Sequence, residues 1–289
     1  MHAHGPVASI RIAFFLNLVF TIIEIVGGIL TNSIAVVADA IHDLGDTIAL
    51  GFALVLEKLA RKKRDPNFSY GYKRFSLLAA MINGIVLIGG SGFVLFYAVP
   101  RLLEPQASNS LGMMGLAAAG IVFNGLGVLR LRKGETMNEK MLTWHLLEDV
   151  LGWVAVLITA VIMYFWHVPI LDPILAIAFT AVTLWNVLRL VKQTMMIFLQ
   201  SVPGNVNVAG IDDRVRKLDG VHSVHDTHVW SMDGEYHVLT THVVIKDSTP
   251  DGDIIPIKQK VREIMNDSKV KHATIEIERE DEPCHLVDC

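Results

Sequence analysis

Six long runs of apolar residues fill roughly the first two thirds of the chain, and each has the length that crosses a membrane as a helix. Charged side chains are rare inside these runs and gather between them. The pattern therefore predicts six transmembrane helices, over Ile12–Ile29, Ile34–Leu56, Phe75–Val99, Leu111–Leu129, Met141–Phe165 and Ile170–Val191.

From about Pro203 the pattern changes to shorter, mixed segments. Helical spacing in "IDDRVRKL" and "DIIPIKQKVREIMN" predicts two helices, and alternation in "VHSVHDTHVWSM", "EYHVLTTHVVI" and "HATIEIE" predicts three strands. Asp233-Gly234 predicts a tight hairpin turn between the first two strands. The fold class is an α-helical membrane protein with six transmembrane helices, residues 1–200, followed by a small α+β domain of order α-β-β-α-β, residues 201–289.

Composition agrees with a membrane protein: 52% of the 289 residues are hydrophobic, only 19% are charged, and the mean hydropathy is +0.45. A net charge of −4 gives no indication of nucleic-acid binding. Lysine and arginine are concentrated after the second, fourth and sixth apolar runs, whereas the opposite loops hold only Arg101. Because cytoplasmic loops carry the excess of basic residues, we expect both termini and the α+β domain in the cytoplasm.

Two of the predicted helices carry an acid and an imidazole on one face. His42 and Asp46 are four residues apart in the second run, as are His145 and Asp149 in the fifth. With a rise of about 1.5 Å per residue, Asp46 lies roughly 20 Å below one membrane surface and Asp149 roughly 16 Å above the other. The two pairs are therefore expected at overlapping depths near the middle of the bilayer.

Two imidazole nitrogens and two carboxylate oxygens suit tetrahedral Zn²⁺, and similar ions such as Cd²⁺ or Co²⁺ are alternatives. A single pair could equally form an interhelical hydrogen bond or line a small wet cavity. Ionisable groups inside a membrane are costly and usually functional, and here the same pair occurs twice. The sequence therefore predicts a metal site made by His42, Asp46, His145 and Asp149.

The chain resembles the cation diffusion facilitators, the family of zinc exporters. The resemblance rests on "LNLVFTIIEIVGG", "SIAVVADAIHDLGDTIAL", "YGYKRFSLLAAMING", "WHLLEDVLGW" and "VHDTHVWSM". It implies that the four residues named above bind the transported metal, and that the metal leaves the cytoplasm in exchange for protons. It also implies a homodimer and a metallochaperone-like fold for the cytoplasmic domain.

The chain departs from some members of that family in two loops. The loop "RDPNFSYGYKR" has Phe68 and Tyr72 but no histidine, so we expect no additional metal site there. The loop "RLRKGETMNEK" is short, and the long histidine-rich loop of many eukaryotic members is missing. This difference favours a prokaryotic plasma (inner) membrane protein.

The α+β domain holds most of the histidines. The resemblance favours His225, His242 and Glu278 as ligands of a second metal site that regulates or stabilises the protein, with His272 as a further candidate. Cys284 and Cys289 are soft ligands for zinc, yet both lie in the last six residues, where an unbound end is the alternative. No disulfide framework is expected from two cysteines so placed.

Two other classes of function are alternatives to proton-coupled export of Zn²⁺. A membrane-embedded metalloenzyme would need an open metal position and a general base, as in HExxH, and that motif is absent. A metal sensor would use its helices only as an anchor, for which six helices with internal ligands are excessive. The prediction is therefore a transporter and not an enzyme.

Overall fold

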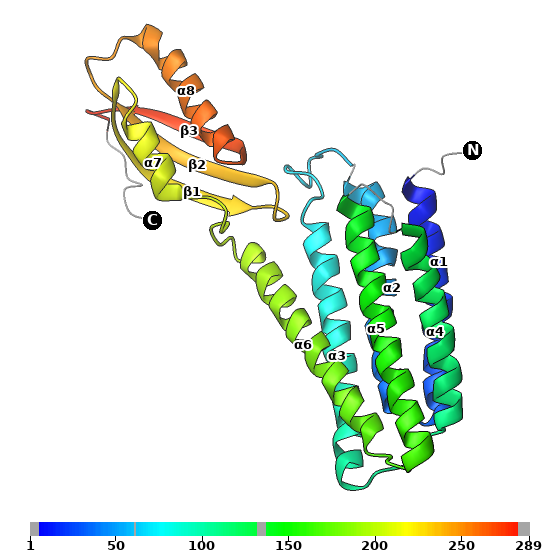
Figure 1. The fold of residues 1–289 in the computed structure, drawn as a ribbon. Helices are drawn as coiled ribbons and strands as arrows, with labels where there is room; N and C mark the ends of the chain where they lie inside the picture. The colour runs from blue at the N-terminus through cyan, green and yellow to red at the C-terminus, as the bar shows by residue number, and fades with distance from the viewer. Residues whose placement is uncertain (1–5, 61, 132–136, 283–289) are drawn as a thin grey trace. The chain divides into compact units, whose positions relative to one another are not determined.

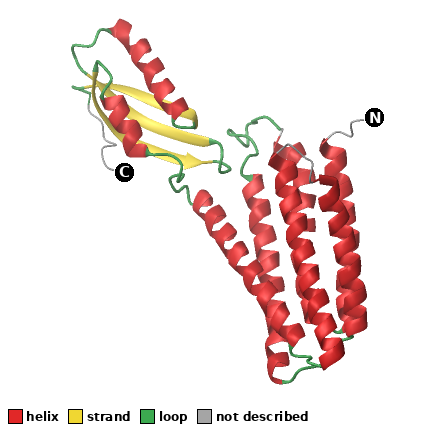
Figure 2. Cartoon of the chain, in the orientation of Figure 1, coloured by secondary structure: helices red, strands yellow, loops and turns green. Residues whose placement is uncertain are grey.

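The structure, a computed structural model, describes residues 6–60, 62–131 and 137–282. The chain divides into two compact units, Met1–Arg61 with Ala79–Val191, and Lys62–Leu78 with Lys192–Cys289. The first unit is helical, and the three strands found in the described ranges all belong to the second (Figure 2). The predicted fold class is confirmed by this combination of a helical bundle and a small α+β unit.

All six predicted transmembrane helices form, within a few residues of the predicted limits. They are α1 Pro6–Thr31, α2 Ile34–Ala60, α3 Phe75–Leu103, α4 Ser110–Leu131, α5 Met137–Trp166 and α6 Leu171–Phe198 (Figure 1). The largest differences are the end of α6, at Phe198 and not Val191, and the start of α1, at Pro6 and not Ile12. Polar residues with good helix propensity continue α6 past its apolar run, and the helix ends just before Gln200, which has a left-handed φ of 59°.

Five of these helices, α1 and α3 to α6, are long and apolar enough to cross a membrane by length and composition. The exception, α2, carries Asp39, Asp43 and Asp46 within two turns. Large apolar side chains on the outside of the bundle are exposed, with Phe96 74% and Trp185 73% accessible. A surface of this kind is stable against lipid and not against water.

Small residues let the helices of the first unit approach closely. A Cβ atom on Gly120 of α4 would lie 2.4 Å from the buried Trp153 ring of α5. The same holds between α2 and α3, where a Cβ on Gly45 would lie 2.6 Å from Leu87 and one on Gly90 would lie 2.5 Å from Ile41. Glycine at such positions is the usual way for membrane helices to pack.

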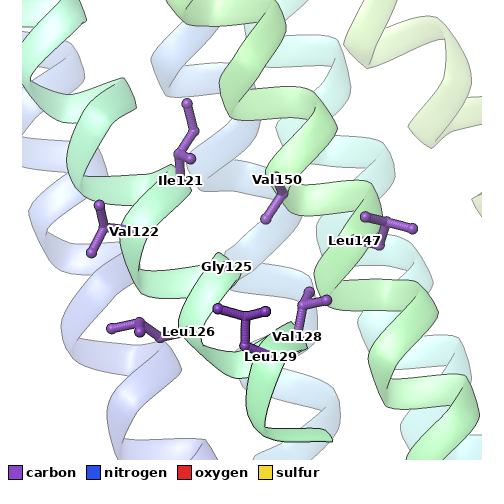
Figure 3. Close-up of a pocket in the computed structure, with 8 residues that line it drawn as sticks. All are labelled: Ile121, Val122, Gly125, Leu126, Val128, Leu129, Leu147 and Val150. Atoms are coloured by element: carbon purple, nitrogen blue, oxygen red, sulfur yellow. The ribbon is translucent and has the colours of Figure 1, made fainter. Parts of the chain in front are cut away.

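A groove of about 430 Å³ lies between α4 and α5 (Figure 3). Its lining is entirely apolar: Ile121, Val122, Gly125, Leu126, Val128, Leu129, Leu147 and Val150. Metal ions in proteins are bound by nitrogen, oxygen and sulfur atoms of side chains or by backbone carbonyls. This groove therefore offers no side-chain ligand for a cation.

The second unit contains the predicted α-β-β-α-β order. Its elements are α7 Val208–Arg216, β1 Val221–Ser231, β2 His237–Ile245, a short 3₁₀ turn at Asp251–Asp253, α8 Ile254–Asp267 and β3 Val270–Arg279. The sheet order is β1-β2-β3, with β1 antiparallel and β3 parallel to the central β2. The parallel pair is possible because α8 provides the crossover connection.

The two faces of this sheet differ in chemistry. Leu239 and Val243 of β2 belong to the core that the sheet forms with α7 and α8, and Ile275 of β3 packs against it. Because side chains alternate along a strand, His242 and Glu276 point to the opposite face. The alternation predicted from the sequence thus separates an apolar face from a face that carries metal-ligating side chains.

The hairpin between β1 and β2 is longer than the predicted tight turn. The loop closes with the Met232 N–H donating to the Tyr236 carbonyl at 2.9 Å. The Asp233 carboxylate accepts from the N–H groups of Glu235 (3.0 Å) and Tyr236 (2.7 Å), and Gly234 has a φ of 97°. Asp233 and Gly234 form the turn as expected, but the aspartate side chain, which the turn pattern ignores, stabilises a wider loop.

Candidate metal centres

A first cluster of metal-ligating side chains lies between α2 and α5. Asp46 Oδ2 is 3.2 Å from His145 Nε2 and 3.7 Å from His42 Nε2. The two imidazole rings meet edge to face, with their centroids 6.2 Å apart. One ligand atom from each of His42, Asp46 and His145 lies within 4.8 Å of the other two. Two helices that are a hundred residues apart in sequence therefore bring three of the four predicted ligands together.

Asp149 lies at the margin of this cluster. Its Oδ2 is 3.9 Å from His145 Nε2, and its side chain is the least exposed of the four at 11%. Ligand atoms about 2.0–2.1 Å from a tetrahedral zinc ion are about 3.3 Å from one another. The spacings of 3.2–3.9 Å around Asp46 and His145 fit such an ion after only small side-chain movements.

Polar contacts with α1 fix α2 beside the cluster. Asn17 Nδ2 donates to the Asp43 carbonyl at 3.1 Å and to Thr47 Oγ1 at 2.9 Å. Thr47 Oγ1 also lies 3.3 Å from Thr21 Oγ1. These three residues are not predicted from the sequence, because single polar side chains in apolar runs carry no motif. They hold the turn of α2 that carries Asp46.

A second cluster lies on the face of the sheet opposite to the helices. His225 on β1 is paired with His242 on β2, and their ring centroids are 5.1 Å apart. Glu278 on β3 bonds His242 Nδ1 through Oε1, and its Oε2 lies 3.5 Å from His225 Nε2. Ligand atoms of all three lie within 4.8 Å of one another, and His242 and Glu278 are buried. Two imidazoles and a carboxylate in this geometry suit zinc.

Two further carboxylates, which the sequence pattern does not predict as ligands, face His242. Asp226 Oδ2 is 3.7 Å and Glu276 Oε2 is 3.6 Å from His242 Nε2. Asp226 has a φ of 50° and lies where the β1–β2 register shifts between His225 and His228. Such a bulge re-aims a side chain, which is why alternation alone did not place Asp226 beside His242.

Comparison with known proteins bears on both clusters. The family model of the cation efflux transmembrane domain matches residues 10–199, and that of the cation efflux protein cytoplasmic domain matches residues 203–280. The chain belongs to the cation efflux family. The first match alone covers more than half of the chain, and the family expected from the sequence motifs is confirmed.

Individual members of the cation efflux family are similar along nearly the whole chain. The cadmium, cobalt and zinc/H(+)-K(+) antiporter of Bacillus subtilis is 31% identical over 96% of this chain and 92% of its own length. The metal cation efflux system protein CzcD of Cupriavidus metallidurans is 32% identical over 99% of this chain and 90% of its own length. The zinc transporter ZitB of Escherichia coli is 33% identical over 96% of this chain and 88% of its own length. The protein is thus a multi-pass membrane transporter of the cation efflux family and not an enzyme.

The remaining predicted ligands of the second cluster lie elsewhere. His272 on β3 pairs with Val238, and its ring packs edge to face against Tyr70 at 5.6 Å, so the fold does not bring it into the cluster. Cys284 and Cys289 lie outside the described residues. For these three residues, metal binding stays a prediction.

The loop before α3 contains a lysine, Lys62, that pairs with the aspartate of the same loop. The Lys62 ammonium donates to Tyr72 Oη (2.5 Å) and lies 3.1 Å from Asp65 Oδ2, to which Tyr72 donates at 2.6 Å. The hydrogen bond from Tyr72 and then that from Lys62 lower the pKa of Asp65 to about 2. In this cation efflux protein, the one carboxylate of the loop is therefore already paired with a positive charge.

Proposed function

We propose that the protein exports a divalent metal ion, Zn²⁺ or alternatively Cd²⁺ or Co²⁺, from the cytoplasm in exchange for protons. The cargo site consists of His42, Asp46, His145 and Asp149. The observation that carries this proposal is the cluster of ligand atoms within 4.8 Å between α2 and α5, in a chain of the cation efflux family. The names of the relatives, with zinc, cadmium, cobalt and H(+), support the same metals and the same counter-ion.

The ligands themselves account for the coupling of metal to protons. Imidazole and carboxylate groups bind a metal ion only in their deprotonated forms, so metal and protons compete for the same atoms. Protons that bind His42 or His145 therefore weaken the coordination of the metal. Metal arriving from the cytoplasm displaces protons, and protons arriving from the other side displace the metal.

The orientation of the protein, its membrane and its oligomeric state are inferred from the basic loops and from the relatives. We place both termini and the α+β domain, residues 201–289, in the cytoplasm, because the basic loops lie on that side of the transmembrane domain, residues 1–200. The bacterial relatives favour a prokaryotic inner membrane. The match to the cytoplasmic domain of cation efflux proteins supports a homodimer as the working form.

Flux into sealed vesicles tests the proposal directly. Purified protein in vesicles with an acidic interior should take up Zn²⁺, Cd²⁺ or Co²⁺ and release protons, and a protonophore should stop the uptake. Metal movement that persists unchanged without a pH gradient would refute the exchange with protons. If the protein binds metal but moves none across the membrane, the alternative function of a metal sensor would be favoured instead.

The cluster of His225, His242 and Glu278 has a different role in this proposal. Its donor set and spacing fit zinc, and it belongs to the α+β unit, whereas the cargo site belongs to the helical unit. Because its ligands come from three strands, a bound ion would hold β1, β2 and β3 in one arrangement. We assign it a regulatory or structural role and not the passage of cargo.

Replacing His242 with alanine and Glu278 with glutamine tests that assignment. The double variant of the full-length protein should lose one class of zinc sites in calorimetry and should transport more slowly than the parent but measurably. His222→Ala is the matched control, since His222 is an exposed histidine of the same sheet, on β1, and contacts only Glu280 among the ion pairs found in the described chain. If the double variant binds as much zinc as the control, the site does not exist.

A further inference from the structure

Asp172 joins the start of α6 to the start of α2. Its carboxylate is buried, with 1% of the residue exposed, and accepts three hydrogen bonds from the beginning of α2. Ser33 Oγ donates to Oδ1 at 2.5 Å, the Ile34 N–H donates to Oδ2 at 2.8 Å, and the Ala35 N–H donates to Oδ1 at 3.2 Å. The two helices are thus linked by a residue 138 positions away from the N–H of Ile34.

The first N–H groups of a helix have no partner inside the helix, and a capping side chain normally satisfies them. In α2 this cap is shared: Ser33 Oγ accepts the Val36 N–H at 3.2 Å and passes its own proton to Asp172. A negative charge is also favoured at the positive end of a helix dipole. Since Asp172 lies in the first turn of α6 as well, one carboxylate serves the starts of two helices.

The surroundings of Asp172 leave this end of α2 little freedom. Ala35 of α2, Ala98 of α3 and Ala176 of α6 are fully buried in one cluster, which brings the three helices close together. The turn between α1 and α2 is also fixed, because Arg101 donates to the Asn32 carbonyl at 2.9 Å and to Asn32 Oδ1 at 2.7 Å. Backbone, side-chain and packing contacts therefore meet at the same end of the helix that carries His42 and Asp46.

We propose that Asp172 is a positioning residue that keeps this end of α2 attached to α6 throughout the transport cycle, so that α2 tilts about a fixed point. This inference rests on the proposed export of metal through His42 and Asp46. These residues lie about 12 and 18 Å along the helix from Ile34. A tilt of about 10° about that point displaces them by about 2–3 Å, as much as a metal–ligand bond length.

The variant Asp172→Asn tests the proposal, because asparagine keeps the size of the side chain but removes the charge and one acceptor oxygen. Uptake into vesicles should show a maximal rate at least about tenfold lower than that of the parent. Zinc affinity of the purified protein, from calorimetry, should stay within about threefold of the parent, since no ligand has changed. Asp172→Glu, which restores the carboxylate, should recover part of the rate.

Thr180→Ala is the matched control, because the buried Thr180 hydroxyl lies on α6 too but donates within its own helix, to the Ala176 carbonyl at 2.7 Å. Its rate, per molecule of folded protein, should stay within about twofold of the parent. The proposal is overturned if Asp172→Asn transports at the parent rate, or if its rate falls only in proportion to its zinc affinity. A parent protein that moves no metal would instead refute the proposed function.

Discussion

Replacing Asp46 with alanine should reduce zinc transport at least about 100-fold while the protein remains folded in the membrane. Removing residues that only orient metal ligands costs about 10–100-fold in metal affinity, so removing a direct ligand should cost more. Asp46 is the strongest choice, because its Oδ2 approaches both histidines: His145 Nε2 at 3.2 Å and His42 Nε2 at 3.7 Å. Initial rates of zinc uptake, read from a zinc-sensitive dye inside the vesicles, give the measurement.

The control for this experiment is Glu148→Gln on α5. Glu148 precedes the predicted ligand Asp149 but is exposed, and it is not one of the three residues whose ligand atoms cluster. Its removal should change the uptake rate by no more than about twofold. Normal transport by Asp46→Ala would remove the central ligand from the proposed site, and an equal loss in both variants would point to a general effect of charge.

Replacing His42 with aspartate should change which metal is carried. Imidazole suits Zn²⁺, whereas an additional carboxylate favours harder ions such as Mn²⁺. His42 approaches Asp46 and His145 closely enough for its replacement to alter the ligand set of a common ion. Competition experiments, with Mn²⁺ present during Zn²⁺ uptake, should show inhibition by Mn²⁺ at a concentration at least about tenfold lower than in the parent.

His167→Asp provides the matched substitution outside the site. His167 follows the end of α5 and has a φ of 52°, a conformation that aspartate tolerates. In this variant, the concentration of Mn²⁺ that inhibits Zn²⁺ uptake should be the same as in the parent. If His42→Asp also leaves this inhibitory concentration of Mn²⁺ unchanged, the packing of the helices and not the imidazole selects the metal.

The parts of the structure that the sequence predicted are those in which neighbouring residues determine the outcome. Apolar length located all six membrane helices, and alternation located β1, β2 and β3. The four-residue spacing placed His42 with Asp46, and His145 with Asp149, on one face of each helix. Matching depth then predicted that the two faces meet, and the distances between Asp46 and His145 agree with that prediction.

The parts that the sequence did not predict depend on partners far away in the chain. Asp172 shows no motif, and its role follows only when α6 begins beside Ser33. Asn17 becomes informative through its contact with Thr47, thirty residues later. Asp226 needed a register shift that alternation cannot express. In each case a single polar residue acts through tertiary geometry, which a local pattern does not contain.

The order of strands in the α+β unit determines when its metal-ligating cluster can first exist. His225 and His242 lie on an antiparallel hairpin that can form locally, whereas Glu278 arrives on β3, which pairs with β2 only after α8 has crossed over the sheet. Contacts between residues far apart in sequence form late, because the intervening chain must first be ordered. During synthesis the hairpin therefore leaves the ribosome with two histidines but without its buried carboxylate. The cluster is completed only after Glu278 has been made, 36 residues after His242, so the hairpin alone cannot form the three-ligand site.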